Sequence, residues 1–117
     1  MSLLISIHEY EIKPGVNYKD FENAVKEADE KGLFKLPGLK EYHFVKGIRG
    51  RRKDKYAAIW IYESKEAWEE LWGPADNPKN KEEYPANWRK WEDEVLAPFL
   101  RREPDKITFT SYQKVDL

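Results

Sequence analysis

The sequence contains no cysteine, and only two of its 117 residues are histidine. A disulfide framework, thiolate chemistry and a cysteine-based metal site are therefore excluded. Two histidines are also too few for a histidine-rich metal site within one chain. His8 and Glu9 cannot act together as metal ligands, because neighbouring residues on a strand point to opposite faces. We therefore expect neither a metal nor an organic cofactor.

Neither sign of charge dominates, since 21 Lys and Arg stand against 22 Asp and Glu, for a net charge of -1. This balance gives no electrostatic reason to expect nucleic acid or an anionic membrane as a partner. No apolar run approaches the roughly 20 residues of a membrane-spanning helix, and no secretory signal is recognisable at the N-terminus. We expect a cytoplasmic protein with a single domain over residues 1–117.

Four segments alternate like β-strands and three have the apolar spacing of helices. The expected strands are 4–12, 39–48, 56–63 and 107–115. Helices are expected after Asn17, after Ser64 and from Pro85, because Asn and Ser favour helix caps and Pro favours a first turn. Residues 74–84 form a long polar loop. The order strand, helix, strand, strand, helix, extra helix, strand predicts an α+β fold. It is the ferredoxin-like split βαβ, with a four-stranded antiparallel sheet and an extra helix before the last strand.

The expected sheet has two dissimilar faces. Ile5, Ile7 and the 57/59/61 set of the third strand form an apolar face, which we expect to pack against the helices. The opposite face carries Ser6, His8, Tyr10, Trp60, Tyr62, Thr110 and Tyr112. Aromatic content is high, at 15%, and a face this aromatic is rarely left exposed. We expect a second copy of the chain to cover it, which predicts a homodimer.

The stretch IWIYESKEAWEEL, with Ser64, Lys65, Ala67 and Trp68 at the strand-to-helix junction, resembles the dimeric α+β barrel superfamily, specifically the antibiotic-biosynthesis-monooxygenase-like proteins. The turns at 13–15 and 36–38 are also similar. The resemblance covers nearly the whole chain in topology. It implies a dimeric α+β barrel with one of several activities: cofactor-free oxygenation of aromatic or quinol substrates, haem degradation, isomerisation or decarboxylation.

The chain departs from two branches of that superfamily. The haem-degrading branch has an Asn on the first strand, a Trp two residues before the capping Ser, and a His after the second helix. The first two places match His8 and Tyr62 here, and no His follows the second helix. The His-Pro-x-His phrase of the stress-responsive barrels is also absent. The first departure argues against haem degradation.

His8 is the sharpest candidate for a catalytic residue. An imidazole in a mostly apolar cavity can act as a base toward a phenol or enol, or can orient it. A deprotonated substrate can then give an electron to oxygen. The expected binding wall for a small aromatic molecule consists of Ser6, Tyr10, Trp60, Tyr62 and Tyr112. The leading hypothesis is a cofactor-independent monooxygenase acting on an aromatic or quinol-like substrate.

Less specific interpretations stay open at each position. His8 can be a structural histidine bonded to a tyrosine or a carbonyl across the sheet, and Trp60 and Tyr62 can be the core of a dimer interface. The face of His43 is ambiguous. The basic stretch 49–55 is expected to be a solvated hairpin, with an anion grip as its alternative. The tryptophans of the helices, Trp68, Trp72, Trp88 and Trp91, are expected in the core.

Two alternative functions follow from these interpretations. The first is a non-catalytic module that binds a small ligand or only dimerises, and the second is a haem-binding protein.

Overall fold

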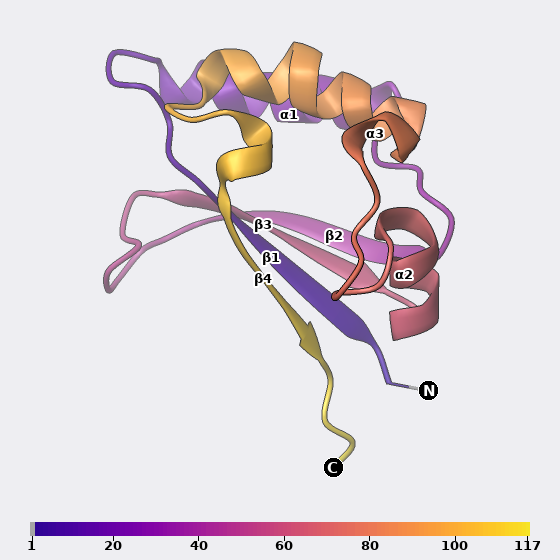
Figure 1. Ribbon diagram of the computed structural model, residues 1–117. Coiled ribbons are helices and arrows are strands. Elements are labelled where there is room, and N and C mark those ends of the chain that lie inside the picture. Colours follow the sequence, from indigo (N-terminus) through magenta and orange to yellow (C-terminus); the bar gives the residue numbers. More distant parts are fainter. Residues whose placement is uncertain (1) are drawn as a thin grey trace.

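The computed structural model describes residues 2–117 and contains one four-stranded antiparallel sheet (Figure 1). Its strands are β1 (Leu4–Tyr10), β2 (Leu39–Lys46), β3 (Tyr56–Tyr62) and β4 (Thr108–Gln113). They lie in the order β2-β3-β1-β4. Helical crossovers thus join β1 to β2 and β3 to β4, each passing over one strand, and the predicted ferredoxin-like α+β fold is confirmed.

All helices lie on one side of this sheet (Figure 1). They are α1 (Tyr18–Glu30), α2 (Lys65–Trp72) and α3 (Ala86–Lys90). The last continues directly into a π-helical turn, η2 (Trp91–Leu96), and a 3₁₀ turn, η3 (Ala97–Phe99). Two further 3₁₀ turns, η1 (Lys81–Glu83) and η4 (Pro104–Lys106), flank this extra helix. The extra helix lies beside α1 above the sheet, so the two form one layer.

The helix ends follow from local chemistry, as the sequence predicted. The side chain of Asn17 accepts a hydrogen bond from the backbone N–H of Lys19, at 2.8 Å. The hydroxyl of Ser64 accepts one from the N–H of Ala67, at 3.1 Å. Both bonds satisfy donors that a first helical turn leaves unpaired. Gly73 ends α2 with a φ of 86°, a value that a residue with a Cβ adopts at a cost.

The sheet presents the opposite face to the helices from the one predicted. Ser6, Tyr10, Trp60 and Tyr62 are buried beneath the helical layer. Ile5 and its alternating neighbours form the open face: Ile7, Ala57, Ile59 and Ile61. The physical reason is volume: α1 and the extra helix enclose a thick layer, and large aromatic side chains fill it where isoleucine and alanine would leave voids. This chain's own helices, rather than a second copy, therefore cover the aromatic face.

The register of β4 shows that Thr110 and Tyr112 lie on a different face from the one predicted. Ile5 is opposite Tyr112 and Ile7 is opposite Thr110. Residues directly opposite each other in a ladder share a face. Tyr112 and Thr110 thus lie on the open face, and the prediction that they share a face with His8 is wrong. His8 is opposite Phe109 instead.

His43 lies on the open face as well, directly opposite Ile59. Its side chain is exposed, with Nε2 3.9 Å from a carboxylate oxygen of Glu41. Tyr42 and Phe44, its neighbours in β2, point into the core. The ambiguity of this strand is thereby resolved. None of the helices described over residues 2–117 is long and apolar enough to cross a membrane.

Candidate functional site

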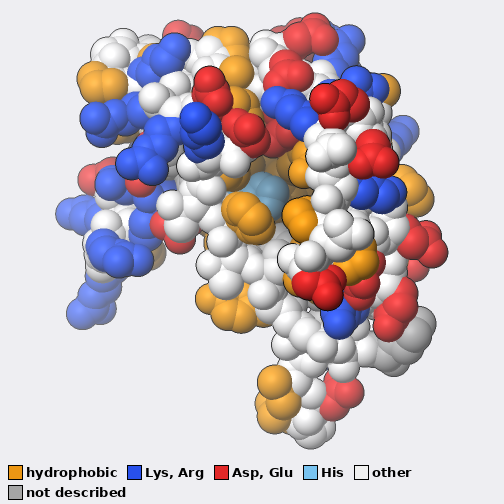
Figure 2. All heavy atoms as spheres, in the orientation of Figure 1, with side chains coloured by type: hydrophobic (Ala, Val, Ile, Leu, Met, Phe, Trp, Pro, Cys, Tyr) orange, Lys and Arg blue, Asp and Glu red, His pale blue; other side chains and the backbone are white. Residues whose placement is uncertain are grey.

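A cavity of about 380 Å³ opens between the sheet and the helical layer. Its floor is the inner face of β1 and β4, and its walls come from α2, the loop that follows it, α3 and η4. The lining residues are mostly aromatic or apolar: Ser6, His8, Tyr62, Trp68, Trp72, Gly73, Pro74, Ala75, Pro78, Tyr84, Trp88, Glu92, Pro104, Asp105, Ile107, Phe109 and Ser111. Figure 2 looks into a hollow with a histidine at its bottom and hydrophobic side chains around it. Such a space suits a small organic molecule.

His8 lies in a cage of three aromatic rings. Its ring centroid is 5.9 Å from that of Trp60, 6.0 Å from that of Trp88 and 5.9 Å from that of Phe109. Burial lowers the pKa of His8 to about 4, because desolvation disfavours the imidazolium. At neutral pH the ring is therefore uncharged. It offers one N–H donor and one nitrogen acceptor, which suits orientation of a ligand better than proton abstraction.

Two hydrogen-bonded pairs fix the polar part of the wall. The hydroxyls of Ser6 and Ser111 are 2.6 Å apart, and either can donate. The indole N–H of Trp72 donates to the hydroxyl of Tyr62, at 3.2 Å. Burial raises the pKa of Tyr62 well above that of free tyrosine. Tyr62 therefore remains a neutral phenol and can itself donate to a ligand.

The structure brings together three of the six side chains predicted for the site. Ser6, His8 and Tyr62 line the cavity. Trp60 is fully buried beside His8, on the same face of the sheet. Tyr10 is also buried, and its ring stacks on Phe44 with the centroids 6.2 Å apart. Trp60 and Tyr10 are thus core residues next to the cavity and do not line it. Tyr112 lies on the other side of the sheet, half exposed.

Three tryptophans expected in the core also form much of the cavity wall: Trp88 is buried in the core, and Trp68 and Trp72 pack against it. Trp68 and Trp72 come from α2, and Trp88 comes from α3. The Trp88 ring packs against that of Trp72, with centroids 5.2 Å apart. Helical spacing alone indicates a buried face and does not distinguish a filled core from the edge of a cavity.

Glu92 is a lining residue that sequence reasoning missed. It belongs to the π-helical turn η2, and only 7% of its surface is exposed. Its Oε1 atom is buried without a hydrogen-bond partner in the described chain. The pKa of Glu92 is raised to about 7, chiefly by burial; the charges of Asp93 and Asp105 add to the shift, while Lys81 and a hydrogen bond from Trp88 oppose it. A carboxylate four residues after Trp88 on an acidic helix carries no sequence signal that separates it from its exposed neighbours.

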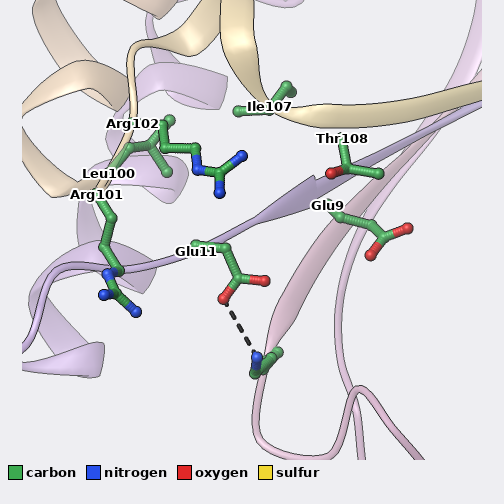
Figure 3. Close-up of a pocket in the computed structure, with 8 residues that line it drawn as sticks. Glu9, Glu11, Leu100, Arg101, Arg102, Ile107 and Thr108 are labelled. Carbon is green, nitrogen blue, oxygen red and sulfur yellow. Dashed lines mark ion pairs between the residues drawn. The ribbon is translucent and has the colours of Figure 1, made fainter.

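A second hollow, of about 420 Å³, lies at the other end of β1 (Figure 3). Its lining is charged: Glu9, Glu11, Lys55, Leu100, Arg101, Arg102, Ile107 and Thr108. Arg52 reaches its rim and contacts Glu11 at 2.7 Å and Glu9 at 3.4 Å. Lys55 contacts Glu11 at 3.3 Å.

These ion pairs tie the β2–β3 hairpin to the end of β1. Arg52 also donates to the carbonyl oxygen of Tyr56, at 2.7 Å. Arg52 is therefore a structural residue and not part of a freely solvated hairpin tip. Although this hollow is slightly larger than the aromatic cavity, its carboxylates already have cationic partners. The aromatic cavity is the better candidate for binding a small molecule.

Across residues 2–117 no cluster of three or more His, Asp or Glu side chains has the geometry of a metal site. The available chemistry at the aromatic cavity is therefore that of a neutral imidazole, hydroxyls, indole N–H groups and one buried carboxyl group.

No family model matches the sequence, and no curated protein sequence matches it either. Solved structures do match. A candidate antibiotic biosynthesis monooxygenase from Bordetella bronchiseptica superposes with a TM-score of 0.66 at 14% identity, covering 98% of this chain and 99% of that one. SnoaB, a cofactor-independent oxygenase from Streptomyces nogalater, gives a TM-score of 0.59 at 12% identity, covering 100% and 97%.

A dimeric ferredoxin-like protein of unknown function from Thermobifida fusca gives a TM-score of 0.58 at 12% identity, covering 97% of this chain and 92% of that one. The chain has the fold of these proteins. The predicted resemblance to the antibiotic-biosynthesis-monooxygenase-like group is confirmed at the level of the fold. At identities this low, the structural similarity shows a shared fold and does not show a shared activity.

Proposed function

We propose that the aromatic cavity binds a flat aromatic or quinol-like molecule and that the protein is a cofactor-independent monooxygenase acting on it. The observation that carries this proposal is the position of His8, at the floor of a 380 Å³ cavity and ringed by Trp60, Trp88 and Phe109. Aromatic walls favour flat ligands through stacked and edge-to-face contacts. The oxygenase SnoaB, which shares the fold, supports the reaction type.

The chemistry is that of a hydroxyarene reacting with dioxygen. Loss of the hydroxyl proton leaves a phenolate, which is electron-rich enough to reduce O₂ without a cofactor. One oxygen atom enters the ring and the second leaves as water, so that a phenol and O₂ give a quinone and H₂O. His8 is the orienting group in this proposal, because its low pKa makes it a weak base. Ser6 and Tyr62 supply further hydrogen bonds to the ligand.

We also propose that the protein is a homodimer and that the open face of the sheet is its interface. This face carries Ile5, Ile7, Ile59 and Ile61 in the centre and Tyr112 at the edge. A contiguous apolar surface on a sheet is costly to leave in water. Fold neighbours from Thermobifida fusca and Jannaschia are described as dimeric. The dimer thus uses the face opposite to the one the sequence predicted.

A non-catalytic ligand-binding protein is the second candidate. The observation that favours it is the chemistry of His8, which is neutral and a poor base. Binding without turnover requires only the aromatic wall and the hydrogen-bonding groups. The two candidates make the same prediction for binding and opposite predictions for oxygen consumption.

Oxygen uptake in the presence of naphthols and quinols separates the candidates. A monooxygenase consumes O₂ in proportion to added protein, whereas a binding protein quenches tryptophan fluorescence without uptake. His8→Ala is expected to weaken binding and uptake together, and His8→Gln is expected to retain part of both because the amide can still donate and accept. Unchanged binding in His8→Ala would refute the role given to His8.

A further inference from the structure

Glu92 is a buried carboxyl group in a wall that is mostly aromatic or apolar. It is 7% exposed, and its Oε1 atom has no hydrogen-bond partner within residues 2–117. The same residue lines the cavity together with His8 and Trp88. A buried carboxyl oxygen without a hydrogen-bond partner costs stability. A polar group kept in that state at the wall of a cavity points to a ligand that satisfies it.

The helix geometry places Glu92 in this position. The backbone changes from α-helical to π-helical at Trp91 and remains so to Leu96. Trp91 packs into the core against Phe34 and Phe44, with centroid separations of 4.9 and 5.6 Å. Its neighbour Glu92 faces the cavity, so the wide turn presents two consecutive side chains inward. Single π turns of this kind occur often at functional sites.

The charges around Glu92 leave it close to half ionised at neutral pH. Burial is the main cause, and it raises the pKa to about 7. Lys81 and a hydrogen bond from Trp88 oppose this shift, and Lys81 is itself held by Asp93 at 2.7 Å. The other titratable groups that face Glu92 from the packed elements are His8 and Tyr10 of β1, Tyr62 of β3, Tyr84, and Asp105 of η4. A carboxylate with a pKa near the working pH is an efficient proton acceptor.

Trp88 connects Glu92 to His8. The Trp88 ring lies edge-on to His8, at an interplanar angle of 77°. Glu92 lies four residues further along the same helix, where side chains share one face of the helix. A flat ligand against the Trp88 ring therefore has a neutral imidazole and a carboxylate within the same small space.

We propose that Glu92 is the proton acceptor of the cavity and that the cavity selects aromatic ligands carrying a weakly acidic hydroxyl group. The inference rests on the proposed function, which places a flat aromatic molecule there. The O–H bond of the ligand breaks, the proton goes to a carboxylate oxygen of Glu92, and the electron pair stays on the ligand oxygen. The buried negative charge moves from Glu92 to the ligand, so its total is unchanged. The imidazole N–H of His8 stabilises the oxyanion.

The test compares two ligands that differ in one proton, 2-naphthol and 2-methoxynaphthalene, by calorimetric titration. Glu92 must be ionised to accept the hydroxyl, so the affinity for 2-naphthol is expected to rise about tenfold between about pH 6 and about pH 8. The affinity for 2-methoxynaphthalene is expected to stay constant. The unmodified protein suffices for this measurement, so it does not depend on the folding of any variant.

Two variants show whether Glu92 causes the pH dependence of 2-naphthol binding. Glu92→Gln keeps the shape but cannot take a proton, and is expected to bind each ligand with an affinity that does not change with pH. Glu94→Gln, an exposed residue of the same helical turn, is the matched control and is expected to behave as the unmodified protein. Infrared difference spectra should show a carboxylic acid band titrating near neutral pH in the unmodified protein and in Glu94→Gln, and not in Glu92→Gln.

The outcomes separate this inference from the function on which it rests. Binding of both ligands with no pH dependence overturns the role of Glu92 and leaves the aromatic cavity as a ligand site. Binding of neither ligand overturns both. A pH dependence that persists in Glu92→Gln assigns the proton acceptor to another group and overturns the inference alone.

Discussion

The His8 ring meets the Trp88 ring edge-on, with centroids 6.0 Å apart. One residue comes from the first strand and the other from the extra helix, so this contact joins the sheet to the helical layer across the floor of the cavity. Substitution of Trp88 by Ala removes that contact together with those to Trp60 and Trp72. We expect a loss of about 3–5 kcal/mol in the free energy of unfolding, measured by urea denaturation.

Trp88→Phe keeps an aromatic ring at the same place. We expect it to cost less than half as much as Trp88→Ala, while weakening the binding of a flat ligand. Equal losses for the two variants would mean that the ring contacts contribute little.

His8 and Glu92 are expected to have opposite effects on stability over one range of pH. His8 binds its proton at about 4 in the folded chain and at 6.5 when free. The contribution of neutral His8 to the free energy of unfolding is therefore lost as pH falls from about 6.5 towards 4. Glu92 has a folded pKa of about 7 against 4.5 when free, so its contribution is lost as pH rises from about 4.5 towards 7. Between about pH 4.5 and 6.5 the two effects on the free energy of unfolding change with pH in opposite directions and cancel.

Single substitutions should reveal the two slopes. In Glu92→Gln the stability is expected to increase with pH over this range, by up to about 1.4 kcal/mol per pH unit. In His8→Gln it should decrease with pH by a similar amount. Chemical denaturation of each variant at a series of pH values measures the slopes. Parallel profiles for the two variants would contradict the opposite shifts.

Arg52 is expected to stabilise the hairpin. Arg52→Ala removes the contacts to Glu9, Glu11 and the carbonyl oxygen of Tyr56. Because the side chain is only partly exposed and makes several bonds, we expect a loss of about 1–3 kcal/mol. Arg51→Ala, at an exposed neighbouring position, is the control and should be nearly neutral. A loss of the same size in both would point to a change in hairpin conformation rather than to the ion pairs.

The open face of the sheet gives the fourth prediction. Ile7→Lys places a charge in the middle of the proposed interface and should convert a dimer to a monomer, measured by light scattering. Ile48→Lys, at an exposed position beyond the end of β2, should leave the mass unchanged. A monomeric unmodified protein would remove the dimer proposal and leave the cavity intact.

Tyr62→Phe tests the hydrogen bond that fixes the wall. The substitution leaves the indole N–H of Trp72 without its partner at 3.2 Å. We expect a cost of about 1–2 kcal/mol and weaker binding of ligands with hydroxyl groups. Thermal unfolding with and without 2-naphthol measures both effects. An unchanged melting temperature would show that the bond contributes little to stability.

The elements and their order were predictable because each depends on nearby residues. Asn17 and Ser64 cap helices through bonds that reach two or three residues, and strand alternation is equally local. The covered face was not predictable in the same way. Alternation defines two faces and does not say which one the helices cover. The choice depended on the thickness of the helical layer, which accommodates Trp60 and Tyr10 where the sequence suggested isoleucine.

The candidate site was predicted in part for the same reason. Ser6, His8 and Tyr62 follow from alternation along single strands. Tyr112 was assigned to the wrong face because the pairing of β4 with β1 joins the two ends of the chain, and no local feature sets that register. Glu92 was missed because its neighbours Asp93 and Glu94 are also acidic, and nothing in the local sequence separates a carboxyl group that lines a cavity from exposed ones.

The aromatic cavity is built entirely from one chain, between its own sheet and its own helices. The site would therefore be complete in each subunit, even if the open faces of two sheets associate. Ligand titration should then follow a simple hyperbola with one equivalent of ligand per polypeptide, and the midpoint should not move when the protein is diluted.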